Sequence, residues 1–280
     1  ENINVKKEIL VKIENNAHKD AIIATNTSTI VLEKLNSILL DKSKLCGIHF
    51  FNPVAKMELV EIVYSPDTNQ QLLMKAVGFI KAIKKIPVVV KSCPGFLVNR
   101  MLLPYMLEAM QLLEEGTKPA AIDKAALAFG MQMGPVMTAD MVGLDVCKLA
   151  LTELNYTIPL KLEALIQANK LGCKTKKGFY NWRHKPVLKL DNYIVDSAIT
   201  ERLIMRLVNE AAACVREGIA HDTASVDVSS VFGFGFAPHL GGIVQYVQHV
   251  GLDNIEQKLV KLENLYGYRF QPDPGLHLLA

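Results

Sequence analysis

The sequence predicts an α/β segment followed by an all-α segment. Over residues 1–92, short apolar runs alternate with stretches of helical periodicity, the order expected when strands and helices form a layered sheet. From Pro94 onward the apolar residues recur at helical spacing, and no clear strand is indicated. Part of the helical segment also repeats after about a hundred residues, which is too long for a solenoid unit and indicates two related domains.

The composition is that of a globular protein. Of the 280 residues, 50% are hydrophobic and 21% are charged, enough to form sizeable cores. The formal net charge is only +3 and the lysines are scattered, so we expect no nucleic-acid partner. Five cysteines without a Cys-x-x-Cys pair favour reduced thiols over disulfides or a zinc site. No apolar run is long enough for a transmembrane segment, and no signal-peptide pattern is present.

The α/β segment divides into helices and strands by periodicity. Apolar residues at helical spacing indicate helices, and short apolar runs bounded by polar residues indicate buried strands. We expect, in order, a helix over 5–13, a strand over 21–25, a helix over 30–38, strands over 45–51 and 57–64, a helix over 68–84 and a strand over 87–91.

Small polar residues follow the first predicted strand. Asn26-Thr27-Ser28-Thr29 stands between this strand and a predicted helix. These side chains are suited to capping that helix, and they also provide a hydrogen-bonding surface at the end of the strand. Both interpretations remain open from the sequence.

One imidazole and one carboxylate lie in neighbouring strands. His49 interrupts an apolar run, and Glu61 stands in the middle of the next one, between Val60 and Ile62. A buried carboxylate needs a cation or hydrogen-bond donors, and His49 is the nearest candidate. A carboxylate on an imidazole fixes its tautomer and raises its basicity. The sequence therefore offers a His–Glu acid–base pair, although a histidine satisfied locally at a strand end is the alternative.

The helical segment begins after a turn. Pro94-Gly95 joins the two segments, and we expect a long helix from Phe96 to Glu115 that ends at Gly116. Asn99 then lies early on this helix, beside the sheet, where a cleft between domains could bind a ligand. A solvated helix residue is the alternative for Asn99.

The repeat relates the two halves of the helical segment. The series Arg100, Glu108 and Glu115-Gly116 recurs at the same spacing as Arg202, Glu210 and Glu217-Gly218. Val142-Gly143-Leu144-Asp145 recurs as Val250-Gly251-Leu252-Asp253, and Gly134-Pro135 matches Ala237-Pro238 in position. We expect three domains, over residues 1–92, 93–183 and 187–280.

Motifs for other chemistries are absent from the sequence. Gly233-Phe234-Gly235 lacks the third glycine of a dinucleotide-binding turn and follows no strand. No Gly-x-Gly-x-x-Gly, P-loop, His-Glu-x-x-His or Gly-x-Ser-x-Gly occurs anywhere in the chain.

Five stretches taken together resemble the 3-hydroxyacyl-CoA dehydrogenase family, in order and at the spacing of that family. They are Asn26-Thr27-Ser28, His49-Phe50-Phe51-Asn52-Pro53-Val54, Leu59-Val60-Glu61, Pro94-Gly95-Phe96-Leu97-Val98-Asn99-Arg100 and Lys174-Thr175-x-x-Gly178-Phe179-Tyr180. The tandem helical domains are similar to those of the multifunctional fatty-acid oxidation α-subunit. The resemblance implies the second half of a Rossmann-type NAD-binding domain, followed by two tandem all-helical C-terminal domains.

The resemblance also implies a reaction, the NAD-dependent oxidation of L-3-hydroxyacyl-CoA to 3-ketoacyl-CoA in fatty-acid β-oxidation. His49 would take the proton of the 3-hydroxyl group, and Glu61 would orient His49 and stabilise its charged form. Ser28 and Asn99 would hydrogen-bond the substrate oxygen or the imidazole. No metal site is implied.

The cofactor residues implied by the resemblance lie in the α/β segment. Glu1 and Lys6 match positions near the ribose and nicotinamide of NAD, and Asn26 and Asn52 would lie close to the nicotinamide. The family's glycine-rich turn is absent from this sequence, which starts at Glu1 without a methionine. We therefore expect a piece of a longer multifunctional chain, weak or inactive as a dehydrogenase on its own.

The family also implies partners and a compartment. We expect an acyl-CoA substrate, a homodimer or a thiolase subunit as partner, and a bacterial-type cytoplasmic location, with mitochondrial or peroxisomal homologues as alternatives. Glu201 stands where the second repeat would need an equivalent of Asn99, so that repeat is expected to be structural. Lys176 replaces a usual glycine and Ala237 a usual proline, both away from the expected chemistry.

Two other functions remain open from the sequence. The chain could be a non-catalytic module that dimerises or docks a thiolase subunit. It could also be another β-hydroxyacid dehydrogenase. Those enzymes usually rely on a catalytic lysine, and the stretch from His49 to Pro53 argues against them.

Overall fold

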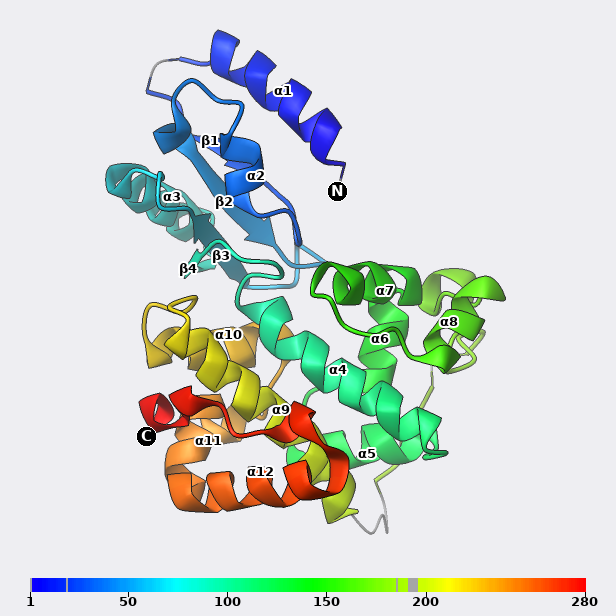
Figure 1. Cartoon of the computed structure of the whole chain (residues 1–280). Helices are drawn as coiled ribbons and strands as arrows, with labels where there is room; N and C mark the ends of the chain where they lie inside the picture. Colours follow the sequence, from blue (N-terminus) through cyan, green and yellow to red (C-terminus); the bar gives the residue numbers. More distant parts are fainter. Residues whose placement is uncertain (1, 19, 185, 191–195) are drawn as a thin grey trace.

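The computed structural model describes residues 2–18, 20–184, 186–190 and 196–280. A small sheet with its helices forms one end of the molecule, and a larger helical body forms the other (Figure 1). The predicted fold class, α/β followed by all-α, is confirmed.

The sheet has four strands in the order β1-β2-β3-β4. Strand β1 (Ile23–Thr25) is parallel to β2 (Leu45–Phe50), which is antiparallel to β3 (Leu59–Tyr64). Strand β4 (Ile86–Lys91) lies parallel to β3 at the other edge. The sheet is therefore mixed, and its parallel portions are those joined by the longer, helix-containing connections.

Alternation along the strands gives the sheet two apolar faces. One face packs on α3 (Gln70–Ala82), with Ile62 and Ile80 among the buried residues. The opposite face joins the main core of the molecule, which includes α2 (Leu32–Asn36). Because side chains alternate with a period of two, Leu45 and His49 of β2 point to this second face.

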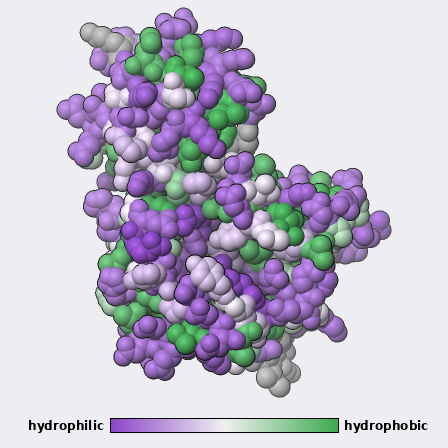
Figure 2. Space-filling view, viewed as in Figure 1, coloured by the Kyte–Doolittle hydropathy of each residue, from purple (hydrophilic) through white to green (hydrophobic). Residues whose placement is uncertain are grey.

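Helix α1 (Ile3–Asn16) covers the outer end of the sheet and buries only Leu10 fully. Apolar side chains gather on the surface over this helix, at the top of Figure 2. The exposed apolar residues of α1 are Val5, Ile9, Val11 and Ile13.

The helical body contains nine α-helices within the described residues. They are α4 (Val98–Glu114), α5 (Pro119–Phe129), α6 (Pro135–Val142), α7 (Leu144–Glu153), α8 (Leu160–Gln167), α9 (Ser197–Arg216), α10 (Thr223–Phe234), α11 (Ile243–Val250) and α12 (Leu252–Tyr266). The 3-10 helices of the described ranges are η1 (Lys42–Lys44), η2 (Cys173–Thr175), η3 (Pro238–Leu240), η4 (Tyr268–Phe270) and η5 (Pro274–Leu279).

Helix α4 begins later than the periodicity predicts. Gly95 and Phe96 have positive φ angles of 79° and 52°, so a tight turn occupies these positions. The first helical residue is Val98, and Leu97 is the N-cap. This turn directs the first backbone N–H groups of the helix toward the sheet, which matters for the site described below.

Helices α4 and α9, which begin the two repeats, lie side by side at the centre of the helical body (Figure 1). The repeated residues meet across this contact. Arg100 Nε donates to Glu210 at 2.7 Å, and its Nη1 donates to Glu217 at 3.2 Å.

The second arginine of the repeat makes the reciprocal contact. Arg202 Nε donates to Glu108 at 2.7 Å, and its Nη1 donates to Glu115 at 2.5 Å. The Arg202 guanidinium also lies 4.0 Å from the centre of the Tyr266 ring. The residues that reveal the repeat in the sequence are therefore the ones that join its two copies.

Each repeat also has an aspartate, buried in the case of Asp123 and half-buried in the case of Asp227, that accepts from the N-terminus of the next helix. Asp123 accepts from Val136 N at 2.8 Å, and Asp227 accepts from Val244 N at 2.7 Å. A Cβ at Gly134 or Gly242 would lie 2.3 Å from the respective aspartate. Gly134 is therefore equivalent to Gly242. The predicted match of Gly134-Pro135 with Ala237-Pro238 is wrong, because Pro238 opens the short helix η3 instead.

None of the helices in the described ranges combines the length and apolarity needed to cross a bilayer. Within the same ranges, no three His, Cys, Asp or Glu side chains are grouped as metal ligands would be. All five cysteines are free thiols.

Candidate active site at the sheet–helix junction

His49 and Glu61 are direct cross-strand partners. The antiparallel register of β2 and β3 pairs these two residues, so their side chains lie on the same face of the sheet. His49 Nδ1 lies 2.7 Å from Glu61 Oε2. The relative exposure is 3% for His49 and 0% for Glu61, so the pair is shielded from water.

The second oxygen of Glu61 is held by helix α4. Glu61 Oε1 accepts hydrogen bonds from Leu97 N at 3.0 Å and Val98 N at 2.9 Å. These N–H groups stand at the helix N-terminus, where they have no partner within the helix and where the helix dipole favours negative charge. A fully buried carboxylate is thus stabilised on both oxygens. The sequence indicated the imidazole partner, but it did not indicate the two backbone donors.

The hydrogen bonds define the tautomer of His49. An ionised Glu61 can only accept, so His49 Nδ1 carries a hydrogen and donates it. The lone pair of Nε2 then faces Ser28, whose Oγ lies 2.9 Å away and donates to it. The arrangement presents one basic nitrogen, backed by a carboxylate and contacted by a hydroxyl group.

Two aromatic rings pack against the imidazole. The ring centroids of His49 and Phe51 are 4.5 Å apart, and those of His49 and Phe96 are 5.5 Å apart. Phe96 is fully buried and belongs to the turn that precedes α4. The imidazole is therefore confined between the end of its own strand and the start of the helical body.

Ser28 reaches His49 because β1 and β2 are parallel neighbours. Their carboxyl ends meet at the same edge of the sheet, and Ser28 follows β1 by three residues. The predicted N-cap at Asn26-Thr27-Ser28-Thr29 is wrong, since α2 starts at Leu32 and its N-cap Val31 has no side-chain cap bond. Thr27 Oγ1 instead accepts from Ile30 N at 3.1 Å and closes a local turn.

The other predicted site residues lie around this edge. Asn99 stands half-buried in the first turn of α4, and Asn52 lies exposed two residues after β2. Neither side chain makes a hydrogen bond within the part of the chain that is described. Lys6 Nζ donates to the carbonyl oxygen of Asn26 at 2.9 Å and to Thr25 Oγ1 at 3.3 Å, a contact that sequence reasoning missed. Glu1 lies outside the described residues.

This set of groups fits the nicotinamide end of NAD. At the carboxyl ends of β1 and β2 the available groups are neutral amides, a hydroxyl and an imidazole, with the Lys6 ammonium held beside Asn26. Dinucleotides bind outside the carboxyl ends of strands in sheets of this kind. The glycine-rich turn that would hold the pyrophosphate is not in the sequence.

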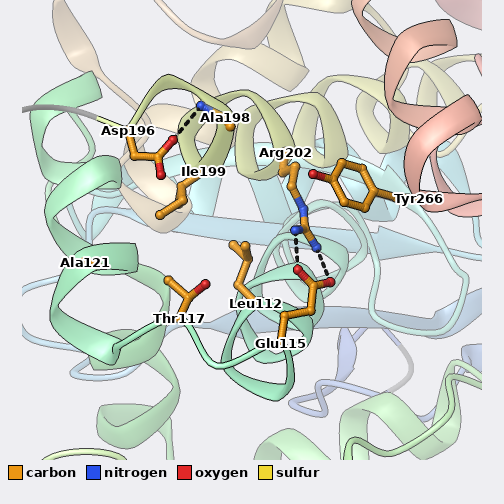
Figure 3. Close-up of a pocket in the computed structure, with 9 residues that line it drawn as sticks. All are labelled: Leu112, Glu115, Thr117, Ala121, Asp196, Ala198, Ile199, Arg202 and Tyr266. Atoms are coloured by element: carbon orange, nitrogen blue, oxygen red, sulfur yellow. Dashed lines mark hydrogen bonds and ion pairs between the residues drawn. The ribbon is translucent and has the colours of Figure 1, made fainter.

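A separate cavity of about 320 Å³ lies between the two helical repeats (Figure 3). Its wall contains Thr117 and Tyr266, and Arg202 and Glu115 point toward one another across it. By the repeat, Thr117 corresponds to Ile219, whose carbonyl oxygen accepts from Lys91 N of the sheet at 3.0 Å. The cavity therefore occupies the surface that in the second repeat contacts the sheet, and it contains none of the predicted site residues.

The fold and the site define a class of protein: an oxidoreductase with a nicotinamide-dinucleotide domain joined to a helical domain, with an imidazole–carboxylate pair at the junction. The sequence model described as the 3-hydroxyacyl-CoA dehydrogenase NAD binding domain matches residues 1–93, and the C-terminal domain of the same family matches residues 95–182. The chain belongs to the 3-hydroxyacyl-CoA dehydrogenase family.

Curated relatives are named for fatty-acid oxidation. The chain is 34% identical over 294 residues to the fatty acid oxidation complex subunit alpha of Vibrio cholerae, covering 99% of this chain and 42% of that protein. It is 36% identical over 300 residues to the glyoxysomal fatty acid beta-oxidation multifunctional protein MFP-a of Brassica napus, covering 97% and 41%. The chain thus spans about two fifths of the length of these relatives.

Solved structures show the same fold. The dehydrogenase part of multifunctional enzyme 1 from C. elegans is 30% identical, with a TM-score of 0.68, and the match covers 100% of this chain and 70% of that one. A 3-hydroxybutyryl-CoA dehydrogenase from Escherichia coli has a TM-score of 0.86 at 23% identity, covering 99% and 79%, and supports the fold alone.

Proposed function

We propose that the protein containing this chain oxidises L-3-hydroxyacyl-CoA to 3-ketoacyl-CoA with NAD, in the β-oxidation of fatty acids, and that His49 and Glu61 are its acid–base pair. The observation that carries the proposal is that both nitrogens of the His49 ring are hydrogen-bonded. Nδ1 lies 2.7 Å from Glu61 Oε2, and Nε2 lies 2.9 Å from Ser28 Oγ. Family membership and the names of the relatives support the substrate class.

In this proposal His49 Nε2 is the general base. It accepts the proton of the 3-hydroxyl group, and Nδ1–H continues to donate to Glu61. The Glu61 charge stabilises the imidazolium that results, as a carboxylate does behind a catalytic histidine in hydrolases. Proton transfer and loss of the C3 hydrogen as hydride together produce the ketone. NAD, when bound, supplies the hydride acceptor.

Ser28 and Asn99 hold the reacting oxygen in the same proposal. Ser28 Oγ–H donates to His49 Nε2. When the substrate hydroxyl group takes this place on Nε2, the Ser28 hydroxyl can donate to the substrate oxygen instead. Asn99 lies one residue after Val98, on the helix turn that holds Glu61, and in this proposal its amide donates to the substrate oxygen. In this proposal the nicotinamide end of NAD binds near Lys6 and Asn26, which are hydrogen-bonded to each other, and near Asn52, which follows the strand that carries His49.

We further propose that the chain alone turns over slowly, because no glycine-rich turn in its sequence holds the NAD pyrophosphate.

The surface available to a partner is limited by contacts within the chain. Arg100 and Arg202 are already paired within the chain across the repeat. A homodimer or a thiolase subunit would therefore use another surface. Light scattering after size exclusion, with and without a thiolase subunit, tests whether the chain forms a homodimer or binds that subunit.

The test of the function is NADH oxidation with acetoacetyl-CoA. It is measured on the chain and on a form extended at its N-terminus by the sequence encoded upstream. We expect the extended form to be active, and His49→Ala to lower kcat by about 10²–10⁴-fold. His249→Ala, an exposed histidine of α11, is the matched control and should retain full activity. An inactive extended form, or an active His49→Ala variant, contradicts the proposal.

A further inference from the structure

Gly233 lies in the last turn of α10, where a glycine is unfavourable by about 0.5–1 kcal/mol relative to alanine. Its φ angle is not positive, so the backbone does not require glycine here. What excludes a larger residue is a close contact. A Cβ at this position would lie 2.8 Å from Val98 Cγ2, 3.1 Å from Val98 Cγ1 and 3.2 Å from Leu59 Cδ2.

Val98 is not an ordinary core residue. Its backbone N–H donates to Glu61 Oε1, and the other oxygen of Glu61 accepts from His49. A continuous series of contacts therefore runs from Gly233, in the second helical repeat, through Val98 and Glu61 to the imidazole. The Gly233-Phe234-Gly235 stretch is not a dinucleotide-binding turn. Its first glycine, Gly233, instead lets α10 approach the helix turn that holds the Glu61 carboxylate.

Other contacts join the second repeat to the same region. Arg100, two residues after Val98, is held by Glu210 of α9 and by Glu217, the C-cap of that helix. The carbonyl oxygen of Ile219, just after α9, accepts from Lys91 N at 3.0 Å at the end of β4. The first turn of α4 is thus held from one side by the sheet, through Glu61, and from the other by α9 and α10.

We propose that the second helical repeat positions the His49–Glu61 pair, and that Gly233 is the positioning residue. Close packing of α10 on Val98 holds the α4 N-terminus at hydrogen-bonding distance from Glu61, which fixes the carboxylate that orients His49. The inference deepens the proposed function, because its consequence for catalysis rests on that function. The contact itself does not depend on the reaction.

The variant that tests this is Gly233→Ala. Alanine favours the helix, so a loss at the active site would arise from displacement of Val98 and not from a weaker α10. Gly78→Ala in α3 is the matched control, because a Cβ at Gly78 meets nothing within 4 Å. Val98→Ala/Gly233→Ala is the rescue, since it removes both Val98 methyl groups that the new Cβ would meet.

The readout is the Nδ1–H proton of His49 in the NMR spectrum of the full chain, assigned by its loss in His49→Gln. A short, buried bond to a carboxylate moves such a proton downfield and protects it from exchange with water. We expect the signal to persist in Gly78→Ala, to shift or broaden in Gly233→Ala, and to return in the double variant. An unchanged signal in Gly233→Ala overturns the proposal.

Failure to fold is also informative. If Gly233→Ala does not fold, the double variant decides: recovery of the fold and the signal supports the proposal, and no recovery overturns it. The measurement requires neither NAD nor turnover. An inactive enzyme with the expected NMR result would therefore reject the proposed function without rejecting this inference.

Discussion

Arg100 and Arg202 occupy equivalent positions in the two helical repeats, and each donates to the glutamates of the other repeat. Such reciprocity is the mark of an isologous contact between two subunits, in which residue i meets j and j meets i. Here both halves belong to one chain. The two arginines differ in burial, with side-chain exposures of 17% for Arg100 and 4% for Arg202.

This difference in burial predicts that replacing Arg202 lowers the free energy of unfolding more than replacing Arg100. Arg202→Met leaves the buried Glu108 with Arg269 as its remaining cation, and we expect a loss of about 3 kcal/mol in the free energy of unfolding. Arg100→Met should cost about 1 kcal/mol, because Arg100 is more exposed and the side chain of its partner Glu210 is 14% exposed, against 1% for Glu108. Urea unfolding of both variants measures the difference. Equal losses would show that burial does not set the strength of these pairs.

Asp123 predicts an unusual pH dependence of stability. Burial raises the pKa of its carboxyl from 3.8 to about 6, against hydrogen bonds from Tyr180, Val136 and Met137 that lower it, while the nearby Asp140 raises it further. At a pH between 3.8 and about 6, Asp123 keeps its proton in the folded chain but has released it in the unfolded chain. The Asp123 contribution to stability therefore falls as pH rises, by about 3 kcal/mol in total.

The measurement is urea unfolding of the wild type and Asp123→Asn, from below pH 4 to about pH 7. Because asparagine does not titrate, the stability advantage of the wild type over the variant should shrink with rising pH. An advantage that stays constant or grows would mean that the three donors outweigh burial and hold Asp123 ionised.

Lys176 predicts a stabilising substitution. Its φ angle is 57°, in the left-handed region, which glycine adopts without strain and lysine does not. We expect Lys176→Gly to gain about 0.5–1 kcal/mol in thermal or urea unfolding. The neighbouring exposed Lys177 has no positive φ angle, so Lys177→Gly should instead lose stability. A loss in both variants would contradict the strain at Lys176.

Much of the fold follows from periodicity, because alternation and helical spacing report which faces are buried. The strand around Glu61 is an example: apolar neighbours on both sides predict burial on both faces, and β3 is buried along Leu59–Val63. The ends of helices and strands are harder to predict from the sequence. The start of α4 depends on the positive φ of Phe96, which no residue preference at that position indicates.

The candidate site shows the same limit. His49 and Glu61 could be paired from the sequence because a buried carboxylate needs a partner and His49 is the nearest candidate. The antiparallel register that places the two residues opposite each other is seen only in the structure. The Val98 N–H on Glu61 could not be predicted, since it depends on where the helical body packs on the sheet. The contact of Gly233 with Val98 spans a still larger separation in sequence, and only the packed structure brings the two together.

The most direct test of the central claim, that His49 and Glu61 act as one acid–base unit, is a double-mutant cycle on kcat. Glu61→Gln replaces an acceptor with an amide group, which can turn His49 into the tautomer whose Nε2 carries a hydrogen and cannot act as a base. His49→Gln removes the base itself. The assay is acetoacetyl-CoA reduction by NADH in the active, N-terminally extended form.

We predict that each single variant loses about 10²–10⁴-fold in kcat, and that the double variant is no slower than the slower single variant, because the two residues serve one step. A double variant whose loss equals the product of the two single losses would contradict the account, and so would a Glu61→Gln variant with full activity.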